Sequence, residues 1–193
     1  MEPPWAVGND PHGPKRSRPR SGRSSTHSLR RGLGQSVRQD HGKRGRCGED
    51  DIGYDTHKKV KGRKRHLLVD TDGRVLKVFV SAADQNDRQG ARQLLSGCKG
   101  VYPRLKRIWA DGQYTGELIE WVSEELGICL EVVEREAGAR GFSVLPRRWV
   151  VERTFAWLGR NKRLVRDYEL CPEHSESMVY VAMTHLLLQR LAA

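Results

Sequence analysis

A chain of 193 residues is long enough for one domain with a hydrophobic core, and 37% of its side chains are hydrophobic. The formal net charge of +11 indicates a polyanionic partner such as nucleic acid, with a merely soluble basic surface as the alternative. No apolar stretch approaches the roughly 20 residues of a membrane span, and the N-terminus lacks the apolar core of a secretory signal, so we expect a cytoplasmic protein with no membrane partner.

The first 48 residues form a basic head rich in Pro, Arg, Ser and Gly. They hold 11 Lys and Arg against three Asp and Glu, a net charge of +8, and few apolar side chains. Such a composition cannot bury a core, so we expect disorder over residues 1–48 and a folded domain over residues 49–193. The head would suit DNA binding, but its composition is equally explained as an accident of coding. The four cysteines show no C-x-x-C pair, and we expect reduced thiols.

Regular elements follow the head. Residues 64–70 (KRHLLVD) and 74–83 (RVLKVFVSAA) predict two strands joined by the turn Thr71-Asp72-Gly73. The remaining elements expected from periodicity and stop signals are a helix at 89–96, a strand at 105–110, a helix at 114–126, a strand at 129–133, and helices at 147–164 and 176–191. This order predicts a mixed, layered α/β domain.

One acid stands at the end of a predicted buried strand. In RIWADGQYTG, residues 107–116, the apolar run ends in Asp111, and Gly112 lets the backbone turn. Strand ends are where open α/β sheets present functional groups. The alternative is an ordinary surface aspartate in a turn.

A second acid lies on the predicted helix within LPRRWVVERTFAWLGRNKRL, residues 145–164. Glu152 shares a helix face with Arg148, Ala156 and Gly159, and the small residues leave room for a large ligand. The alternative is a surface pair between Arg148 and Glu152. Two carboxylates beside many arginines suit Mg²⁺ bound next to a phosphodiester. The run HKKVKGRKRH, residues 57–66, adds cations, with a solvated charge run as its alternative.

Three segments resemble the catalytic domain of bacterial DDE transposases, specifically those of insertion sequence family five. They are GYDTHKKVKGRKRHLLVDTDG (53–73), WADGQY (109–114) and LPRRWVVERTFAWLGRNKRL (145–164), and the resemblance spans residues 53–191. It implies a ribonuclease H-like mixed sheet with flanking helices, in which three acids hold two Mg²⁺ ions for DNA strand cleavage and transfer. The second acid of the family falls on Asp111 and its glutamate on Glu152.

The resemblance also implies partners. They are the DNA of terminal inverted repeats and targets, and further copies of the chain in a synaptic complex. Arg148 matches the family's motif arginine, while Arg160 and Lys162 are both candidates for the basic residue after the glutamate. The side chains that we expect to contact DNA are Lys58, Lys59, Lys61, Arg63, Lys64, Arg65, Arg147, Arg148, Arg153, Arg160, Lys162 and Arg163.

The first acid of the family is missing. Its motif, of the type Asp-Ser-Gln-Ser, corresponds to RGLGQSVRQ (31–39), where Leu33 occupies the aspartate position. Leucine cannot bind a metal, so we expect an incomplete first strand, poor binding of at least one Mg²⁺ and little or no activity. A truncation or a change of reading frame near Gly34 would explain both Leu33 and the unusual head.

Other acids are poor substitutes for the missing ligand. Turn chemistry accounts better for the candidates, which are Asp50, Asp51, Asp55, Asp70 and Asp72. Two other functions therefore stay open beside a DDE transposase. One is a non-catalytic DNA-binding fragment that interferes with the full-length enzyme, and the other is a poorly folded fragment without function.

Overall fold

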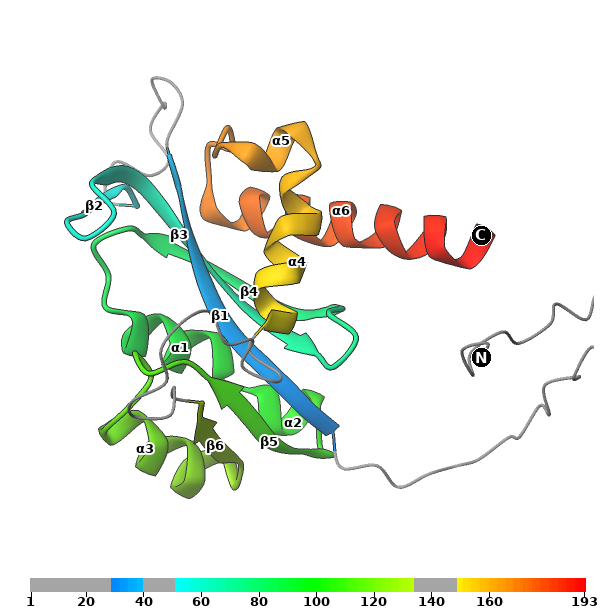
Figure 1. Ribbon diagram of the computed structural model, residues 1–193. Helices are drawn as coiled ribbons and strands as arrows, with labels where there is room; N and C mark the ends of the chain where they lie inside the picture. The colour runs from blue at the N-terminus through cyan, green and yellow to red at the C-terminus, as the bar shows by residue number, and fades with distance from the viewer. Residues whose placement is uncertain (1–28, 40–50, 134–148) are drawn as a thin grey trace, which may run out of the picture.

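A computed structural model describes residues 29–39, 51–133 and 149–193, the first of these ranges for its backbone only. The strands in these ranges are β1 (Leu29–Gln39), β2 (Gly53–Asp55), β3 (Val60–Asp70), β4 (Val75–Ala82), β5 (Leu105–Ala110) and β6 (Cys129–Val132). The helices are α1 (Asp87–Leu95), α2 (Cys98–Val101), α3 (Glu117–Leu126), α4 (Trp149–Gly159), α5 (Lys162–Val165) and α6 (Pro172–Ala192). The strands join in a single mixed sheet (Figure 1).

Strand β1 lies in the middle of this sheet. It pairs antiparallel with β3 on one side and parallel with β5 on the other, and β6 continues the sheet parallel to β5. Beyond β3 lie β4 and the short β2, both antiparallel to it. The mixed sheet with flanking helices that we expected for a ribonuclease H-like fold is confirmed.

The central position of β1 corrects the expectation of an incomplete first strand. Residues 29–39, which we assigned to the disordered head, form an 11-residue strand with ladders on both sides. The physical reason is that backbone hydrogen bonds hold a central strand whichever side chains it carries. The sheet therefore begins before residue 49, while residues 1–28 and 40–48 of the head lie outside the described residues.

The helices cover both faces of the sheet. On one face, Leu68 and Ile108 of the strands pack with Leu94 of α1 and Leu118 of α3. On the other, Leu67 of β3 packs in a cluster with α4, α5 and α6. Because neighbouring residues of β3 point to opposite faces, a strand buried on both sides reads as a continuous apolar run. Figure 1 shows the resulting three layers, with α1 and α3 opposite α4, α5 and α6.

The predicted β-hairpin of β3 and β4 forms, and its turn contacts α4. The carboxylate of Asp70 accepts the N–H groups of Asp72 and Arg74, at 2.9 and 2.8 Å. Gly73 has a φ of +84°, and a side chain there would collide with Thr154 of α4. The buried hydroxyl of Thr154 lies 3.0 Å from the carbonyl oxygen of Gly73. Glycine is therefore required at this position both for the turn and for the close approach of α4.

The prediction of a single helix over residues 147–164 is wrong. In the described residues it is two helices, because α4 ends at Gly159 and Asn161 caps α5 by accepting the N–H of Arg163 at 3.1 Å. Residues 147 and 148 lie outside the described part.

The other expected elements are present with small shifts of their ends. Helix α3 begins at Glu117 rather than residue 114, since Gly116 with a φ of +74° precedes it. Helix α6 begins at Pro172 rather than residue 176, and proline suits the first turn of a helix. Cys171 just before it is disulfide-bonded, which corrects our expectation of reduced thiols, whereas Cys98 and Cys129 are free.

Candidate functional site

Asp111 stands at the carboxyl end of β5, as predicted. The strand before it is buried through Ile108, Trp109 and Ala110, whereas Asp111 itself is half-buried. One oxygen of its carboxylate accepts the N–H of Gln113 at 3.0 Å, and its carbonyl accepts the N–H of Tyr114 at 3.2 Å. The acid therefore sits in a tight turn that fixes its position at the end of the strand.

Tyr114 anchors this turn in the core. Its side chain is fully buried, and its hydroxyl has no hydrogen-bond partner among the described residues. Burial raises the pKa of Tyr114 well above its usual value, and the negative charges of Asp87 and Asp111 raise it further. The buried, neutral side chain of Tyr114 therefore anchors the turn that carries Asp111 to the core.

Glu152 lies in the first turn of α4 and is exposed. The buried positions of the helix, Val150, Val151, Thr154 and Leu158, turn toward the sheet. Ala156, one turn after Glu152, is exposed as well, so the predicted face of small residues beside the acid is open to solvent. Arg148, which we placed on the same face, lies outside the described residues.

The fold brings the elements that carry the two acids together around β1. Helix α4 contacts β1, and β5 is hydrogen-bonded to β1 on its other edge (Figure 1). The parallel ladder pairs Arg31 with Ile108 and Gly32 with Trp109. One residue further along the same register, Leu33 comes beside the end of β5. Leu33, the position to which the resemblance assigns the first acid, therefore lies in the strand next to β5, and Asp111 follows β5.

The donor set matches a divalent-metal site only in part. Within the residues that the structure describes, no group of three or more His, Cys, Asp or Glu is placed to hold a metal ion. Carboxylates are the right ligands for Mg²⁺, which needs one or two of them plus water and substrate phosphates. Asp111 and Glu152 are therefore suitable ligand types for one Mg²⁺ ion. With Leu33 in β1, they do not supply enough ligands for two.

The carboxylates of Asp55 and Asp70 act in turns, as expected. Burial alone would raise the pKa of Asp55, but the N–H groups of Lys58 and His57, each 2.9 Å away, and the charge of Lys64 outweigh burial and lower it. These bonds stabilise the loop between β2 and β3 in the same way that Asp70 stabilises the β3–β4 turn.

Three of the side chains expected to bind DNA are buried, and this part of the prediction is wrong. Arg63, Lys64 and Arg65 are 0%, 5% and 3% exposed. They lie on β3 where helices cover both faces, so the charge run is not a solvated surface. This burial was not predictable from the sequence, because the carbonyl oxygens that accept hydrogen bonds from Arg63 and Arg65 lie about 100 residues further along the chain. Lys64 bonds to the segment before α1.

The two buried arginines attach the connection after α4 to the sheet. Arg65 donates to the carbonyl oxygen of Leu164 at 2.8 Å. Arg63 donates to the carbonyl oxygen of Leu170 at 2.8 Å and lies 3.5 Å from the carboxylate of Asp167, which is also fully buried. Buried guanidinium groups persist only with such partners. Their role here is structural.

The remaining candidate DNA-binding side chains fall into three groups. Lys58, Lys59, Lys61, Arg160 and Lys162 are exposed. Arg163 is exposed but paired with Glu169 at 2.7 Å, and Arg153 lies between the rings of Trp149 and Trp157, 4.0 and 4.6 Å from their centres. Arg147 and Arg148 lie outside the described residues. The sequence also missed a cavity beside Asp111, lined by residues 54–58, 83–88 and Gln113 with Lys64, because three separate segments form it.

Comparison with known proteins gives a consistent picture. The profile of the family described as "Transposase DDE domain" matches residues 24–188. A protein from Burkholderia cepacia described as a proposed transposase for insertion sequence element IS402 is 30% identical over 118 residues, which are 56% of this chain and 54% of that protein. The chain therefore spans about half the length of this relative.

Among solved structures, the catalytic core domain of BIV integrase aligns at 15% identity with a TM-score of 0.47, covering 81% of this chain and 82% of that one. The HTLV-2 integrase catalytic core domain, solved in complex with magnesium, aligns at 14% identity with a TM-score of 0.46 over the same shares. Both scores are below 0.5, so the description of the fold rests on the strand order and pairing above. In the described residues, no helix combines the length and the apolar character of a membrane span.

Proposed function

Because this chain belongs to the family of transposase DDE domains, we propose that it is the catalytic part of a DNA transposase, which cleaves and transfers DNA strands at the ends of an insertion sequence. The observation that carries the proposal is the arrangement around β1. Asp111 ends the strand on one side, and α4 with Glu152 contacts the same central strand. We assign this chain to insertion sequence family five and its action to DNA in the cytoplasm.

Asp111 and Glu152 are the proposed metal ligands. A bound Mg²⁺ supplies Lewis-acid chemistry at a phosphodiester, namely polarisation of the phosphorus centre and stabilisation of the leaving oxygen. The turn of Gln113 and Tyr114 holds Asp111 in place, and the open face around Ala156 leaves room for a DNA strand beside Glu152.

The exposed cations are the proposed contacts to the DNA backbone. Lys58, Lys59 and Lys61 come from the β2–β3 hairpin, and Arg160 and Lys162 come from the end of α4 and the start of α5. Arg147 and Arg148 extend this set ahead of α4. The proposed DNA partners are the terminal inverted repeats and the target, bound by a synaptic complex that contains more than one copy of the chain.

We propose that Leu33 leaves this chain with little or no activity. The strand around Leu33 is complete, so the defect is one missing ligand and not a missing element. The change of reading frame that we expected near Gly34 is not supported, because the family match begins at residue 24 and β1 begins at Leu29, both ahead of that position.

Restoring the ligand tests the proposal directly. The variant Leu33→Asp should cleave DNA that carries the ends of its element when Mg²⁺ is added, and the wild-type chain should not. Adding Asp111→Asn or Glu152→Gln to Leu33→Asp should abolish this cleavage, and Leu33→Asn controls for polarity at the same position. Cleavage by wild type would contradict the predicted inactivity. A folded, DNA-binding Leu33→Asp chain that never cleaves would overturn the assignment of the site.

Leu33 also favours a second function, a non-catalytic fragment that occupies DNA ends or joins mixed oligomers with an intact transposase. In that case binding should fall steeply with salt, as for any contact with phosphates. It should also be unaffected by Asp111→Asn and Glu152→Gln. Measuring binding of these variants at two salt concentrations, beside the cleavage assay, separates the two functions.

A further inference from the structure

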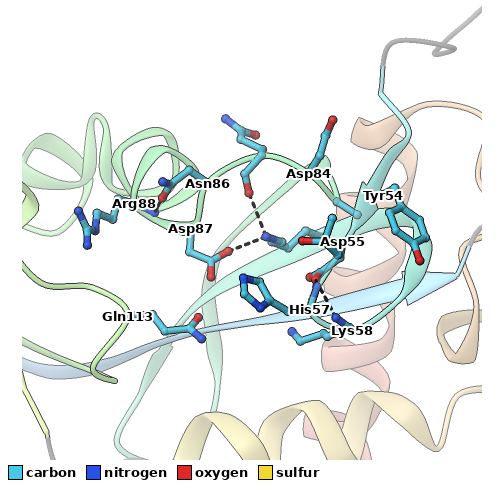
Figure 2. Close-up of a pocket in the computed structure, with 13 residues that line it drawn as sticks. Tyr54, Asp55, His57, Lys58, Asp84, Asn86, Asp87, Arg88 and Gln113 are labelled. Atoms are coloured by element: carbon cyan, nitrogen blue, oxygen red, sulfur yellow. Dashed lines mark hydrogen bonds and ion pairs between the residues drawn. The ribbon is translucent and has the colours of Figure 1, made fainter.

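The cavity beside Asp111 is not used by the proposed metal site. It has a volume of about 710 Å³ and lies between the β2–β3 hairpin and the N-terminal end of α1. Figure 2 shows Arg88 and Gln113 at one end and Tyr54 and Lys58 at the other. Because the N–H of Gln113 binds the carboxylate of Asp111, one end of the cavity is fixed two residues from the proposed metal ligand.

The acids of this cavity are largely occupied within the protein. Asp55 accepts the N–H groups of His57 and Lys58, at 2.9 Å each. Asp87 accepts the Nζ of buried Lys64 at 2.7 Å. Asp84 points away from the side of the cavity where His57 and Gln113 lie (Figure 2). The carboxylates of Asp55 and Asp87 therefore stabilise the walls of the cavity, and the cations at its two ends are left to act on a ligand.

The cations and the aromatic ring at the ends are available. Lys58 and Arg88 are exposed, and in the described part of the chain neither side chain has an ion-pair partner. Tyr54 is 51% exposed, so its ring is accessible to a ligand in the cavity. Cations that follow a groove, combined with an aromatic ring on which a base can stack, are the features by which proteins bind single-stranded nucleic acid.

We propose that this cavity holds an unpaired stretch of DNA strand next to the phosphodiester at Asp111, with Lys58 and Arg88 at its phosphates and Tyr54 stacked on a base. A volume of about 710 Å³ falls in the range of roughly 300–1,000 Å³ typical of pockets for small ligands, which suits individual nucleotides and not a duplex. The side chain of His57 lies between the two ends, where a base would sit. This inference rests on the proposed function.

The test compares two DNA molecules on the full chain. One is a blunt duplex, and the other is the same duplex with a short single-stranded overhang, both followed by fluorescence anisotropy. The wild-type chain should bind the overhang DNA more tightly. Tyr54→Ala and Arg88→Ala should each remove about tenfold of this preference and leave blunt-duplex binding unchanged. Tyr54→Phe should retain the preference, because stacking needs only the ring.

Lys106→Ala is the matched control, since Lys106 is an exposed cation on β5 that does not line the cavity. It should leave the preference for overhang DNA intact. Inorganic phosphate and a mononucleotide, added as competitors, distinguish a strand from free phosphate. Displacement of the overhang DNA by millimolar phosphate alone would show a simple anion site and overturn the proposal.

The results distinguish failure of the strand-binding cavity from failure of the proposed function. Equal affinity for blunt and overhang DNA, or an unchanged preference in both Tyr54→Ala and Arg88→Ala, overturns the strand-binding cavity and leaves the proposed function standing. No binding of either DNA by the wild-type chain overturns the proposed function itself, and the cavity with it.

Discussion

Acid should destabilise this protein through His66, which is held neutral inside the sheet. The side chain is fully buried, its Nε2 lies 3.0 Å from the hydroxyl of Ser81, and its ring stacks on Phe79. A side chain at Gly90 would collide with the ring, so α1 packs directly against it. Burial lowers the pKa of His66 from 6.5 to about 4, although the charge of Asp87 acts in the opposite direction.

The direction of the effect follows from the pH at which the folded and the unfolded chain each take up a proton. In the unfolded chain the imidazole is protonated below about pH 6.5, whereas in the folded protein it stays neutral until about pH 4. Protons therefore favour the unfolded chain over this interval, and stability falls as the pH drops. With 1.36 kcal/mol for each pKa unit, the loss from His66 alone by about pH 4.5 is about 2.5 kcal/mol.

Urea unfolding at about pH 7.5 and pH 4.5 measures this loss. The variant His66→Gln keeps a polar group near Ser81 but does not titrate. Between the two pH values it should lose about 2.5 kcal/mol less stability than the wild-type chain. His185→Gln, at an exposed position of α6, should behave as wild type. If wild type and His66→Gln lose the same stability on acidification, the reasoning about the buried neutral ring is wrong.

Two further substitutions test how α4 and the connection after it are attached. Gly73→Ala forces a side chain into a left-handed turn and against Thr154, so the free energy of unfolding should fall by about 2–4 kcal/mol, measured by urea unfolding. Arg65→Ala leaves the carbonyl of Leu164 unpaired and should lower the free energy of unfolding by about 1–3 kcal/mol. Lys61→Ala should change this free energy by less than about 0.5 kcal/mol, because Lys61 is exposed. It should also reduce the slope of log affinity for DNA against log salt concentration by about one. A stability loss in Lys61→Ala equal to that in Arg65→Ala would contradict the assignment of the two cations.

Local signals predicted the elements that local chemistry determines. The turn at Thr71-Asp72-Gly73 and the strand at 105–110 appear where the sequence places them, because turn residues and a short apolar run suffice to specify them. Breaks inside long patterns were harder. Residues 147–164 read as one helix because the apolar stripe continues to Leu164, and only the cap at Asn161 reveals the interruption.

The candidate site was predictable where it depends on one segment at a time. Asp111 and Glu152 stand on the expected strand end and helix, since each follows from a local pattern. The cavity was not predictable, because its walls come from a hairpin, a strand-to-helix connection and the turn after Asp111. No single stretch of sequence contains that juxtaposition.

Strand β3 shows why a count of cationic residues overestimates the number of side chains that can contact nucleic acid. The run from Lys58 to Arg65 has uniform composition, yet the structure divides it at Gly62. Before Gly62 the lysines extend from a hairpin into solvent, where a phosphate can reach them. After it, the cations pair with carbonyls and carboxylates of α5, of the α5–α6 connection and of the β4–α1 segment. Substitution of Lys58, Lys59 or Lys61 should therefore change the salt dependence of DNA binding. Substitution of Arg63, Lys64 or Arg65 should instead destabilise the fold.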